Sequence, residues 1–445
     1  MNLPLRDGVT LVYPYFRSSD PVPRLFPPLG IAYLASQMRE MEVAVDICDC
    51  TFRTFSEAVE EIAGRRPAIV GISIMVTMSG NAFRLLEALR TRLPGTLFVA
   101  GGPLPTVHPA MFTVEFDAVF CGEGDVAFPS FCRDYLAGRE DPGRDSPIDV
   151  SRYPGLCMRV DGGLRSTPPV HNPPEVLDRL PLPDRAVFDH ARYQEAMEGS
   201  IGCRQTSIMV TRGCPYSCDF CSKPVWGNAF RKPLLEKVFA EIDGILSLGY
   251  DSLWIADDCF TLDTGFLTGF CNGMILRDKP VSWTCLSRVD RLDSGLVGLM
   301  KDAGCTKVFL GLESGSDTTL QLMNKRVTVR EGTDAVNLFS NAGIATAGFF
   351  MVGYPGETHD SVERTFAHSL SLPLEEAWFT IPLPLPGTPL FSRVADIGTW
   401  EDWDFSNQVK FVYHTDFDTV WLKKRIDETM GLFRAKKLKA GVPNP

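Results

Sequence analysis

The feature that most constrains the fold is a regular alternation of short apolar runs with longer amphipathic runs, in two successive series. In the first series, apolar runs such as residues 9–16, 68–76 and 96–102 are separated by stretches with helical periodicity, for example residues 28–41. This rhythm is typical of a parallel sheet whose two faces are covered by helices. We therefore predict a doubly wound, Rossmann-like α/β domain over residues 1–150.

The second series begins after a segment rich in Pro and Asp. Residues 151–204 contain runs such as HNPPEVLDRLPLPD, and we expect a connecting strap there rather than a packed domain. About six strand candidates then alternate with helical segments, which is short of the eight units of a closed barrel. The candidates are residues 206–213, 252–258, 281–289, 307–314, 345–353 and 377–384. The sequence predicts a partial (β/α)6 barrel over residues 205–395 and a helical tail over residues 396–445.

Composition excludes several classes of function. The formal net charge is −11, and no cluster of Lys and Arg interleaved with aromatic residues occurs, which argues against nucleic-acid binding. No apolar stretch approaches the roughly 20 residues that cross a bilayer, and the first residues lack the features of a signal peptide. We expect a cytoplasmic protein without a membrane partner. The 13 cysteines are scattered through a long chain, which favours thiols in a reducing compartment over a disulfide framework.

Three of the cysteines stand close together, just after the first strand of the second series. Cys214, Cys218 and Cys221 fall within eight positions, in the sequence TRGCPYSCDFC. Three thiolates suit an iron–sulfur cluster, and a cubane held by only three cysteines leaves one iron open to an exogenous ligand. The alternative is a structural zinc site, but such a site takes four ligands, and no histidine follows at finger-like spacing.

This spacing, with the aromatic residue Phe220 in the last gap, resembles the C-x-x-x-C-Φ-x-C signature of the radical S-adenosylmethionine (SAM) superfamily. The resemblance implies a [4Fe–4S] cluster whose open iron binds the amino and carboxylate groups of SAM, and a contact of Phe220 to SAM. It implies an enzyme that cleaves SAM to a 5′-deoxyadenosyl radical and abstracts hydrogen from an unactivated carbon, which side chains alone cannot do. An external single-electron reductase, flavodoxin-like or another oxidoreductase, is implied as a partner.

Charged residues at the ends of barrel strands are candidates for contacts to SAM, because barrel enzymes place functional groups at the C-terminal ends of strands. These candidates are Asp257, Asp258, Arg288 and Glu313. The resemblance implies that the two aspartates accept hydrogen bonds from the SAM amino group. It implies that Arg288 and Glu313 bind the SAM carboxylate and ribose. The alternatives are a helix N-cap for the aspartates and a structural salt bridge for the other two residues.

Two later segments also resemble parts of this family. The sequence MVGYPGET, with Gly353 and Pro355, resembles the loop after the fifth strand that approaches the SAM adenine, where glycine allows close backbone contact. Residues 382–391, PLPLPGTPLF, resemble the exit of the last strand. Without the resemblance, both segments predict only turns and loops.

The first domain resembles the cobalamin-binding domain of cobalamin-dependent radical SAM enzymes, on segments that include GISIMV, AGGPLP and DAVFCGEGD. Glycines at a strand's C-terminal end let a ligand approach the backbone, so Ser73, Gly101 and Gly102 are the candidates for cobalamin contacts if cobalamin binds. The alternative for these glycines is ordinary turn chemistry. His108 lies outside a D-x-H-x-x-G motif, so histidine ligation of cobalt is not supported. The alternative that this domain binds nothing and serves only as a scaffold also remains.

Two enzymatic functions fit these features. The first is a methyltransferase, which would carry out cobalamin-supported C-methylation of a small polar natural-product substrate. The second is a cobalamin-independent dehydratase or lyase that acts on an aminosugar in aminoglycoside antibiotic biosynthesis; the short segment after residue 391 favours it, because many methylating relatives carry a larger C-terminal domain. A non-enzymatic electron carrier would also use cysteines, but it would need neither a barrel nor acidic strand ends. The fold cannot select a substrate.

Overall fold

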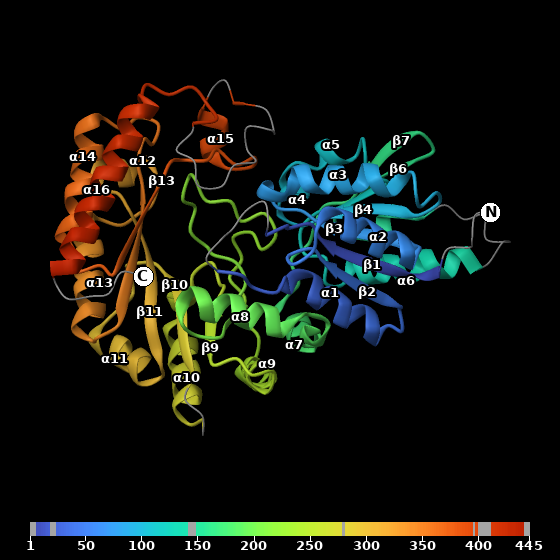
Figure 1. Cartoon of the computed structure of the whole chain (residues 1–445), viewed down its shortest axis with the longest axis horizontal. Coiled ribbons are helices and arrows are strands. Elements are labelled where there is room, and N and C mark those ends of the chain that lie inside the picture. The colour runs from blue at the N-terminus through green and yellow to red at the C-terminus, as the bar shows by residue number, and fades with distance from the viewer. Residues whose placement is uncertain are drawn as a thin grey trace. The chain divides into compact units, whose positions relative to one another are not determined.

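The computed structural model describes residues 6–17, 24–140, 148–277, 281–394, 397–398 and 411–439. The chain divides into two compact units. The first consists of Met1–Ser200, Lys223–Gly227 and Trp400–Ser406. The second consists of Ile201–Ser222, Asn228–Thr399 and Asn407–Pro445. Each unit contains its own sheet with parallel strands, which confirms the α/β class and the two predicted series (Figure 1).

The first unit is built on a seven-stranded sheet in the order β2-β1-β3-β4-β5-β6-β7. Its parallel strands are β1 (Arg6–Tyr13), β2 (Val45–Asp49), β3 (Pro67–Ser73), β4 (Leu97–Gly101) and β5 (Ala118–Phe120). The sheet ends in an antiparallel hairpin of β6 (Leu156–Val160) and β7 (Gly163–Ser166). The expectation of a bare strap over residues 151–204 is therefore wrong in its first part, because β6 hydrogen-bonds to β5 and extends the sheet.

Helices cover both faces of this sheet, as the doubly wound prediction requires. One apolar core contains residues of α1 (Leu29–Glu40) and α6 (Ala127–Glu140), and the other contains residues of α2 (Phe55–Arg65) and α3 (Ser79–Arg90). The remaining helices of this part are α4 (Pro103–Val107), α5 (Pro109–Phe112), α7 (Pro174–Arg179) and α8 (His190–Ile201). Three short 3₁₀ turns lie at Val76–Met78, Val150–Arg152 and Arg185–Val187.

The second unit contains a six-stranded sheet in the order β13-β12-β11-β10-β9-β8. Every neighbouring pair is parallel, and each strand lies beside the next one in the sequence. The strands are β8 (Gln205–Ile208), β9 (Ser252–Ile255), β10 (Ser282–Ser287), β11 (Cys305–Glu313), β12 (Ala345–Met351) and β13 (Glu376–Thr380). This order is the wall of a partial (β/α)6 barrel, as predicted.

Helices follow the strands of the barrel, and several of them cover one face of its sheet (Figure 1). They are α9 (Leu235–Ser247), α10 (Thr264–Ile275), α11 (Ser294–Asp302), α12 (Asp317–Leu322), α13 (Val329–Asn341), α14 (His359–Ser371) and α15 (Pro389–Arg393), with a 3₁₀ turn at Phe260–Leu262. Several start at side-chain caps: Asp263 and Asp293 accept hydrogen bonds from the first turns of α10 and α11, and Thr328 forms a capping box with Glu331 in α13. Such caps satisfy backbone N–H groups that have no partner within the helix.

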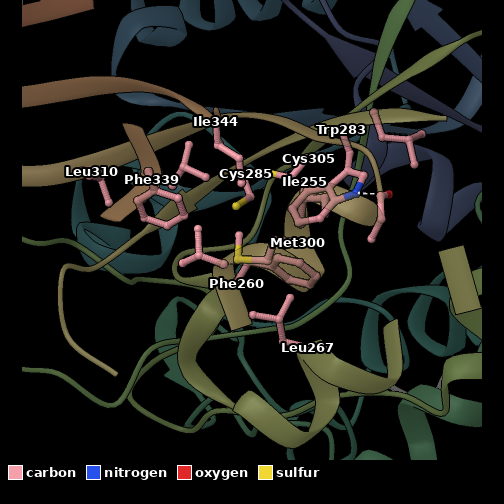
Figure 2. Close-up of a cluster of buried hydrophobic side chains, with 14 of the residues drawn as sticks. Ile255, Phe260, Leu267, Trp283, Cys285, Met300, Cys305, Leu310, Phe339 and Ile344 are labelled. Atoms are coloured by element: carbon pink, nitrogen blue, oxygen red, sulfur yellow. Dashed lines mark hydrogen bonds between the residues drawn. The ribbon is translucent and has the colours of Figure 1, made fainter. Parts of the chain in front are cut away.

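Apolar side chains between the sheet and these helices form the barrel core (Figure 2). Trp283 is fully buried there, and its indole N–H donates to the carbonyl of Ala303 at 2.8 Å. The rings of Phe260 and Phe270 meet it edge-on at 5.7 and 5.6 Å between ring centroids. Trp283 is therefore a core residue.

The C-terminal helix α16 (Thr419–Lys439) packs against the last part of the barrel. Leu422 and Ile426 join a buried cluster with Val352, Val362 and Phe366, as expected for a helical tail that docks on the barrel. In the described part of the chain, none of the helices combines the length and the apolar character that a bilayer crossing requires.

Candidate active site at the strand ends of the second unit

The three cysteines of the predicted cluster site lie on the loop that follows β8, at the C-terminal edge of the barrel sheet. Cys214 and Cys218 are each 9% exposed, Cys221 is half-buried, and all three are free thiols. The backbone N–H of Cys221 donates to the carbonyl of Cys218 at 3.2 Å. Two backbone hydrogen bonds of 2.9 Å between Arg212 and Arg231 close the base of the loop. One closed loop therefore presents all three sulfurs.

The alternative for these sulfurs is a structural zinc site. Among the described residues, no three Cys, His, Asp or Glu side chains come together around a position for one metal ion. A structural zinc site needs four ligands about 2.0–2.3 Å from one ion. A loop with three spaced thiols fits a larger iron–sulfur cluster, in which the ligands are spread over several irons.

Asp257, at the end of β9, holds the start of this loop. Its carboxylate accepts hydrogen bonds from the backbone N–H groups of Val210 and Thr211, each at 2.7 Å, and from the Thr211 hydroxyl at 2.6 Å. The side chain is 1% exposed, and burial raises the pKa of Asp257 to about 7. Both carboxylate oxygens are thus used by the protein, whereas Asp258 is exposed. The expected contacts of these two residues to the SAM amino group stay predictions.

Arg288 follows β10 and lies beside one cysteine of the triplet. Its Nη1 is 3.8 Å from the Cys218 Sγ, and its guanidinium carbon is 3.6 Å from the ring centroid of Tyr216. The Arg288 Nε donates to Asp290 at 2.8 Å, and the Tyr216 hydroxyl donates to the same carboxylate at 2.6 Å. Burial disfavours the charge of Asp290, but the Tyr216 hydrogen bond and the Arg288 charge together lower its pKa. Arg288 is therefore a fixed cation at the cysteine loop.

Glu313 ends β11 and pairs with Lys325. The Lys325 Nζ donates to the Glu313 Oε1 at 2.6 Å, and the two side chains are 7% and 9% exposed. Burial disfavours the Lys325 charge, but the charges of Glu313 and of Cys218 raise the Lys325 pKa above its ordinary value. Glu313 has a φ of 60°, in the left-handed region, where a residue other than glycine is strained. Glu313 therefore combines a strained backbone with a buried ion pair at the end of β11.

Phe220 anchors the far end of the cysteine loop. Its ring packs beside a small buried cluster of Met323, Met351, Tyr354 and Leu390. Backbone hydrogen bonds join the neighbouring Asp219 to the Met323 carbonyl at 2.9 Å and to the Leu390 N–H at 3.0 Å. The structure places Phe220 against the cysteine loop's own supports, and its expected contact to SAM stays a prediction.

Gly353 and Pro355 follow β12. Gly353 has a φ of 80°, and a Cβ atom there would lie 2.7 Å from the ring of Phe411. The Tyr413 hydroxyl donates to the Gly353 carbonyl at 3.4 Å, and Pro355 is half-buried. The segment that precedes α16 therefore already explains why position 353 is glycine. Contact of this loop with the SAM adenine stays a prediction.

In the first unit, Ser73 and Gly101 pair across the ends of β3 and β4. Gly102 has a φ of 101°, and a Cβ there would lie 2.9 Å from the backbone nitrogen of Ile74, so turn geometry explains this glycine. A Cβ at Gly101 would meet only the Phe120 carbonyl oxygen, at 3.9 Å. Packing does not require glycine at position 101, whereas close approach of a ligand to this strand end would.

Two family models match the chain: the B12 binding domain over residues 21–131 and the radical SAM superfamily over residues 208–368. The uncharacterized methyltransferase PH0819 of Pyrococcus horikoshii is 31% identical to the chain over 375 residues, which cover 82% of this chain and 78% of the relative. The chain belongs to the radical SAM superfamily. Within it, this radical SAM enzyme is one of those with a B12-binding domain ahead of the barrel, as the sequence resemblance implied.

Other relatives of this radical SAM enzyme share both parts of the chain. The anaerobic magnesium-protoporphyrin IX monomethyl ester cyclase of Rubrivivax gelatinosus is 27% identical over 380 residues, covering 83% of this chain and 67% of the cyclase. The structure of the radical SAM methyltransferase TsrM from Kitasatospora setae, with cobalamin and a [4Fe–4S] cluster bound, superposes with a TM-score of 0.71. That match has 20% identity and covers 87% of this chain and 74% of TsrM, so it shows a common fold.

The cofactors of the radical SAM family, a [4Fe–4S] cluster and SAM, fit the residues found at the barrel's strand ends. The cysteine loop offers three thiols, and Arg288 and Glu313 lie at the ends of the next strands, as predicted. Lys325, Tyr216 and Asp290 are not among the residues predicted from the sequence. Tyr216 stands inside the cysteine motif and Asp290 two residues after Arg288, but Lys325 lies in the unremarkable stretch MNKR, which carries no strand-end signal.

Proposed function

We propose that this radical SAM enzyme is a cobalamin-supported C-methyltransferase that acts on a small polar natural-product substrate. The observation that carries the proposal is the presence of a B12-binding domain and a radical SAM domain in one chain. In support, the relative PH0819, which is named a methyltransferase, aligns over 82% of this chain. The comparisons do not favour the cobalamin-independent dehydration of an aminosugar.

When bound, the cluster and SAM supply a 5′-deoxyadenosyl radical, and cobalamin supplies a transferable methyl group. The chain's own residues hold these groups. The thiols of Cys214, Cys218 and Cys221 are the cluster ligands in this proposal, and Asp257 fixes the start of their loop. Arg288 and Glu313 present a cation and a carboxylate to the SAM amino-acid and ribose groups. At the first unit, the bare backbone of Gly101 would let the corrin approach the sheet edge.

The substrate side of the barrel is expected on the sheet face that the helices leave uncovered. Side chains alternate along a strand, so Phe309, between the core residues Val308 and Leu310, lies on that opposite face. Trp254 meets the Phe309 ring edge-on at 4.9 Å, and Phe349 stacks on it at 5.8 Å. An aromatic surface of this kind keeps water away from a reactive radical, a general need of such chemistry.

The experiment is anaerobic reconstitution with iron, sulfide and hydroxocobalamin, followed by desalting and incubation with methyl-deuterated SAM and a reductant. We expect cobalamin to be retained, deuterated methylcobalamin to form and 5′-deoxyadenosine to be released, as measured by absorbance and mass spectrometry. Release of 5′-deoxyadenosine without retained cobalamin would contradict methyl transfer and would support dehydration instead. If the protein neither retains cobalamin nor releases 5′-deoxyadenosine, the result would point to an electron carrier.

A cysteine pair gives the matched control for this experiment. Cys221→Ala removes one of three cluster ligands and should abolish 5′-deoxyadenosine formation. Cys203→Ala makes the same change at another half-buried cysteine, outside the triplet, and should leave cluster content and 5′-deoxyadenosine formation near the wild-type level. Equal losses in the two variants would show that the triplet has no special role.

A further inference from the structure

The turn after α12, residues 323–326, touches most of the groups that form the site. Its Met323 carbonyl accepts the Asp219 N–H at 2.9 Å, and its Asn324 side-chain amide donates to the Ser217 carbonyl at 2.6 Å. Its Lys325 carbonyl accepts the Arg288 Nη2 at 2.8 Å. The 323–326 turn therefore connects the cysteine loop to the end of β10.

The backbone of this turn is strained on both sides of Lys325. Asn324 has a φ of 49° and Arg326 a φ of 56°, both in the left-handed region. Such conformations are disfavoured in residues other than glycine and persist only where the surrounding contacts impose them. The result is that the Lys325 side chain is buried at the site, only 7% exposed, although lysine is rarely buried.

The Lys325 ammonium holds one oxygen of the Glu313 carboxylate and leaves the other available. The ion pair joins Lys325 Nζ to Glu313 Oε1 at 2.6 Å, and no described residue donates a hydrogen bond to Oε2. A Cβ at Gly311 would lie 2.6 Å from both the Oε1 and the Nζ, so the pair lies directly over the bare backbone of β11. A buried carboxylate with one fixed and one available oxygen is suited to accept hydrogen bonds from a vicinal diol.

We propose that Lys325 is a positioning residue of the SAM site: its ammonium orients Glu313 so that Oε2 accepts hydrogen bonds from the ribose hydroxyls of SAM, and its carbonyl orients Arg288. The proposal rests on SAM binding, which the radical SAM family membership implies, and not on methyl transfer. Without the ammonium, Glu313 would be a buried carboxylate without a counter-charge, and it would turn away or take up a proton.

Lys307 lies on β11, the strand that ends at Glu313, and provides a matched control. It lies towards the N-terminal end of β11, its side chain is 17% exposed, and it pairs with Glu376 at 2.6 Å and Glu375 at 2.7 Å. Lys307→Met therefore removes a lysine–carboxylate contact from the same sheet, far along the strand from the cysteine loop. A purely structural role of Lys325 predicts that Lys325→Met and Lys307→Met behave alike.

The test uses the anaerobically reconstituted full-length protein and measures SAM affinity by equilibrium dialysis, with iron content and the change in the reduced cluster's EPR spectrum on adding SAM as further readouts. We expect Lys325→Met to keep wild-type iron content and to raise the Kd for SAM at least tenfold. Lys325→Arg should restore the Kd to within about threefold of wild type, since a cation is kept. Lys307→Met should leave the Kd unchanged.

A SAM analogue that lacks the ribose 2′-hydroxyl separates positioning from general damage. The wild-type protein should bind this analogue more weakly than SAM, whereas Lys325→Met should bind the two almost equally, because effects on one shared contact are not additive. A wild-type Kd in Lys325→Met, a preference for SAM that survives this substitution, or loss of iron from Lys325→Met alone would overturn the proposal. Absence of cobalamin binding would overturn the proposed methyl transfer and leave this measurement unaffected.

Discussion

Replacing Asp257 by asparagine perturbs the support of the cysteine loop without changing the volume of the side chain. The carboxylate receives two backbone N–H groups and one hydroxyl, from Val210 and Thr211. In Asp257→Asn, an amide NH₂ must face at least one of these donors. Leaving a buried donor without an acceptor destabilises a protein by about 1–3 kcal/mol. The wild type avoids this loss only where Asp257 is ionised, so the two proteins must be compared on both sides of the Asp257 pKa.

The same comparison should change with pH. Burial raises the pKa of Asp257 from its ordinary value of 3.8 to about 7, so the folded protein binds this proton more tightly than the unfolded chain does. The contribution of Asp257 to stability is then fully present below the unfolded pKa and is lost as the pH rises through the folded pKa. A difference of about three pH units corresponds to about 4 kcal/mol in total, of which about 3 kcal/mol falls between pH 5 and pH 8.

Melting temperatures of the apoprotein, measured by calorimetry at pH 5 and pH 8, test this reasoning. The melting temperature of Asp257→Asn relative to wild type should rise by about 6–12 °C between the two pH values, because 1 kcal/mol shifts a domain of this size by about 2–4 °C. Asp251→Asn is the control, since Asp251 lies at the other end of β9 and its side chain is 46% exposed. A difference between wild type and Asp257→Asn that stays constant with pH would refute the assignment of a proton-binding buried carboxylate.

Four further substitutions test other parts of the structure. Gly102→Ala should destabilise the first unit by about 1–3 kcal/mol, because the φ of Gly102 is 101°. Gly101→Ala should leave the melting temperature unchanged and lower the amount of cobalamin retained after desalting. Full retention of cobalamin by Gly101→Ala would argue that no corrin approaches this strand end. Gly353→Ala should lower the melting temperature of the second unit, because its Cβ would lie 2.7 Å from Phe411; an unchanged temperature would mean that the segment before α16 is displaced at no loss. Leu422→Ala, at a fully buried position, should destabilise by about 2–5 kcal/mol in urea unfolding, and an effect below about 0.5 kcal/mol would show that α16 does not support the barrel.

The parts of the fold that depend on local pattern were predictable. Runs such as residues 68–76 became buried strands, and the helix starts at Asp263 and Thr328 carry their caps in the sequence. The hairpin of β6 and β7 was missed because its strands are short and lie in a Pro-rich region, where the pattern favours a loop. Its pairing depends on the free edge of β5, which no local pattern encodes.

The candidate site was also only partly predictable from the sequence. The cysteine triplet and the charged strand ends at Arg288 and Glu313 can be read along the chain, because parallel strands bring their C-terminal ends to one edge. The function of Asp257 as a support for the cysteine loop could not be read, since an acidic strand end looks the same whether it faces a ligand or a backbone N–H. Lys325 was missed altogether, because its burial against Glu313 depends on a turn far along the chain.

By itself, the sequence determined the two α/β units, the three thiols of the cluster loop and the charged ends of the barrel strands, since these follow from periodicity and from spacing within a few residues. The tertiary structure decided which charges are partnered by the protein and which remain available to a ligand. The physical reason is that burial and hydrogen bonding depend on groups brought together from distant segments, as Asp257 meets Thr211 and Glu313 meets Lys325.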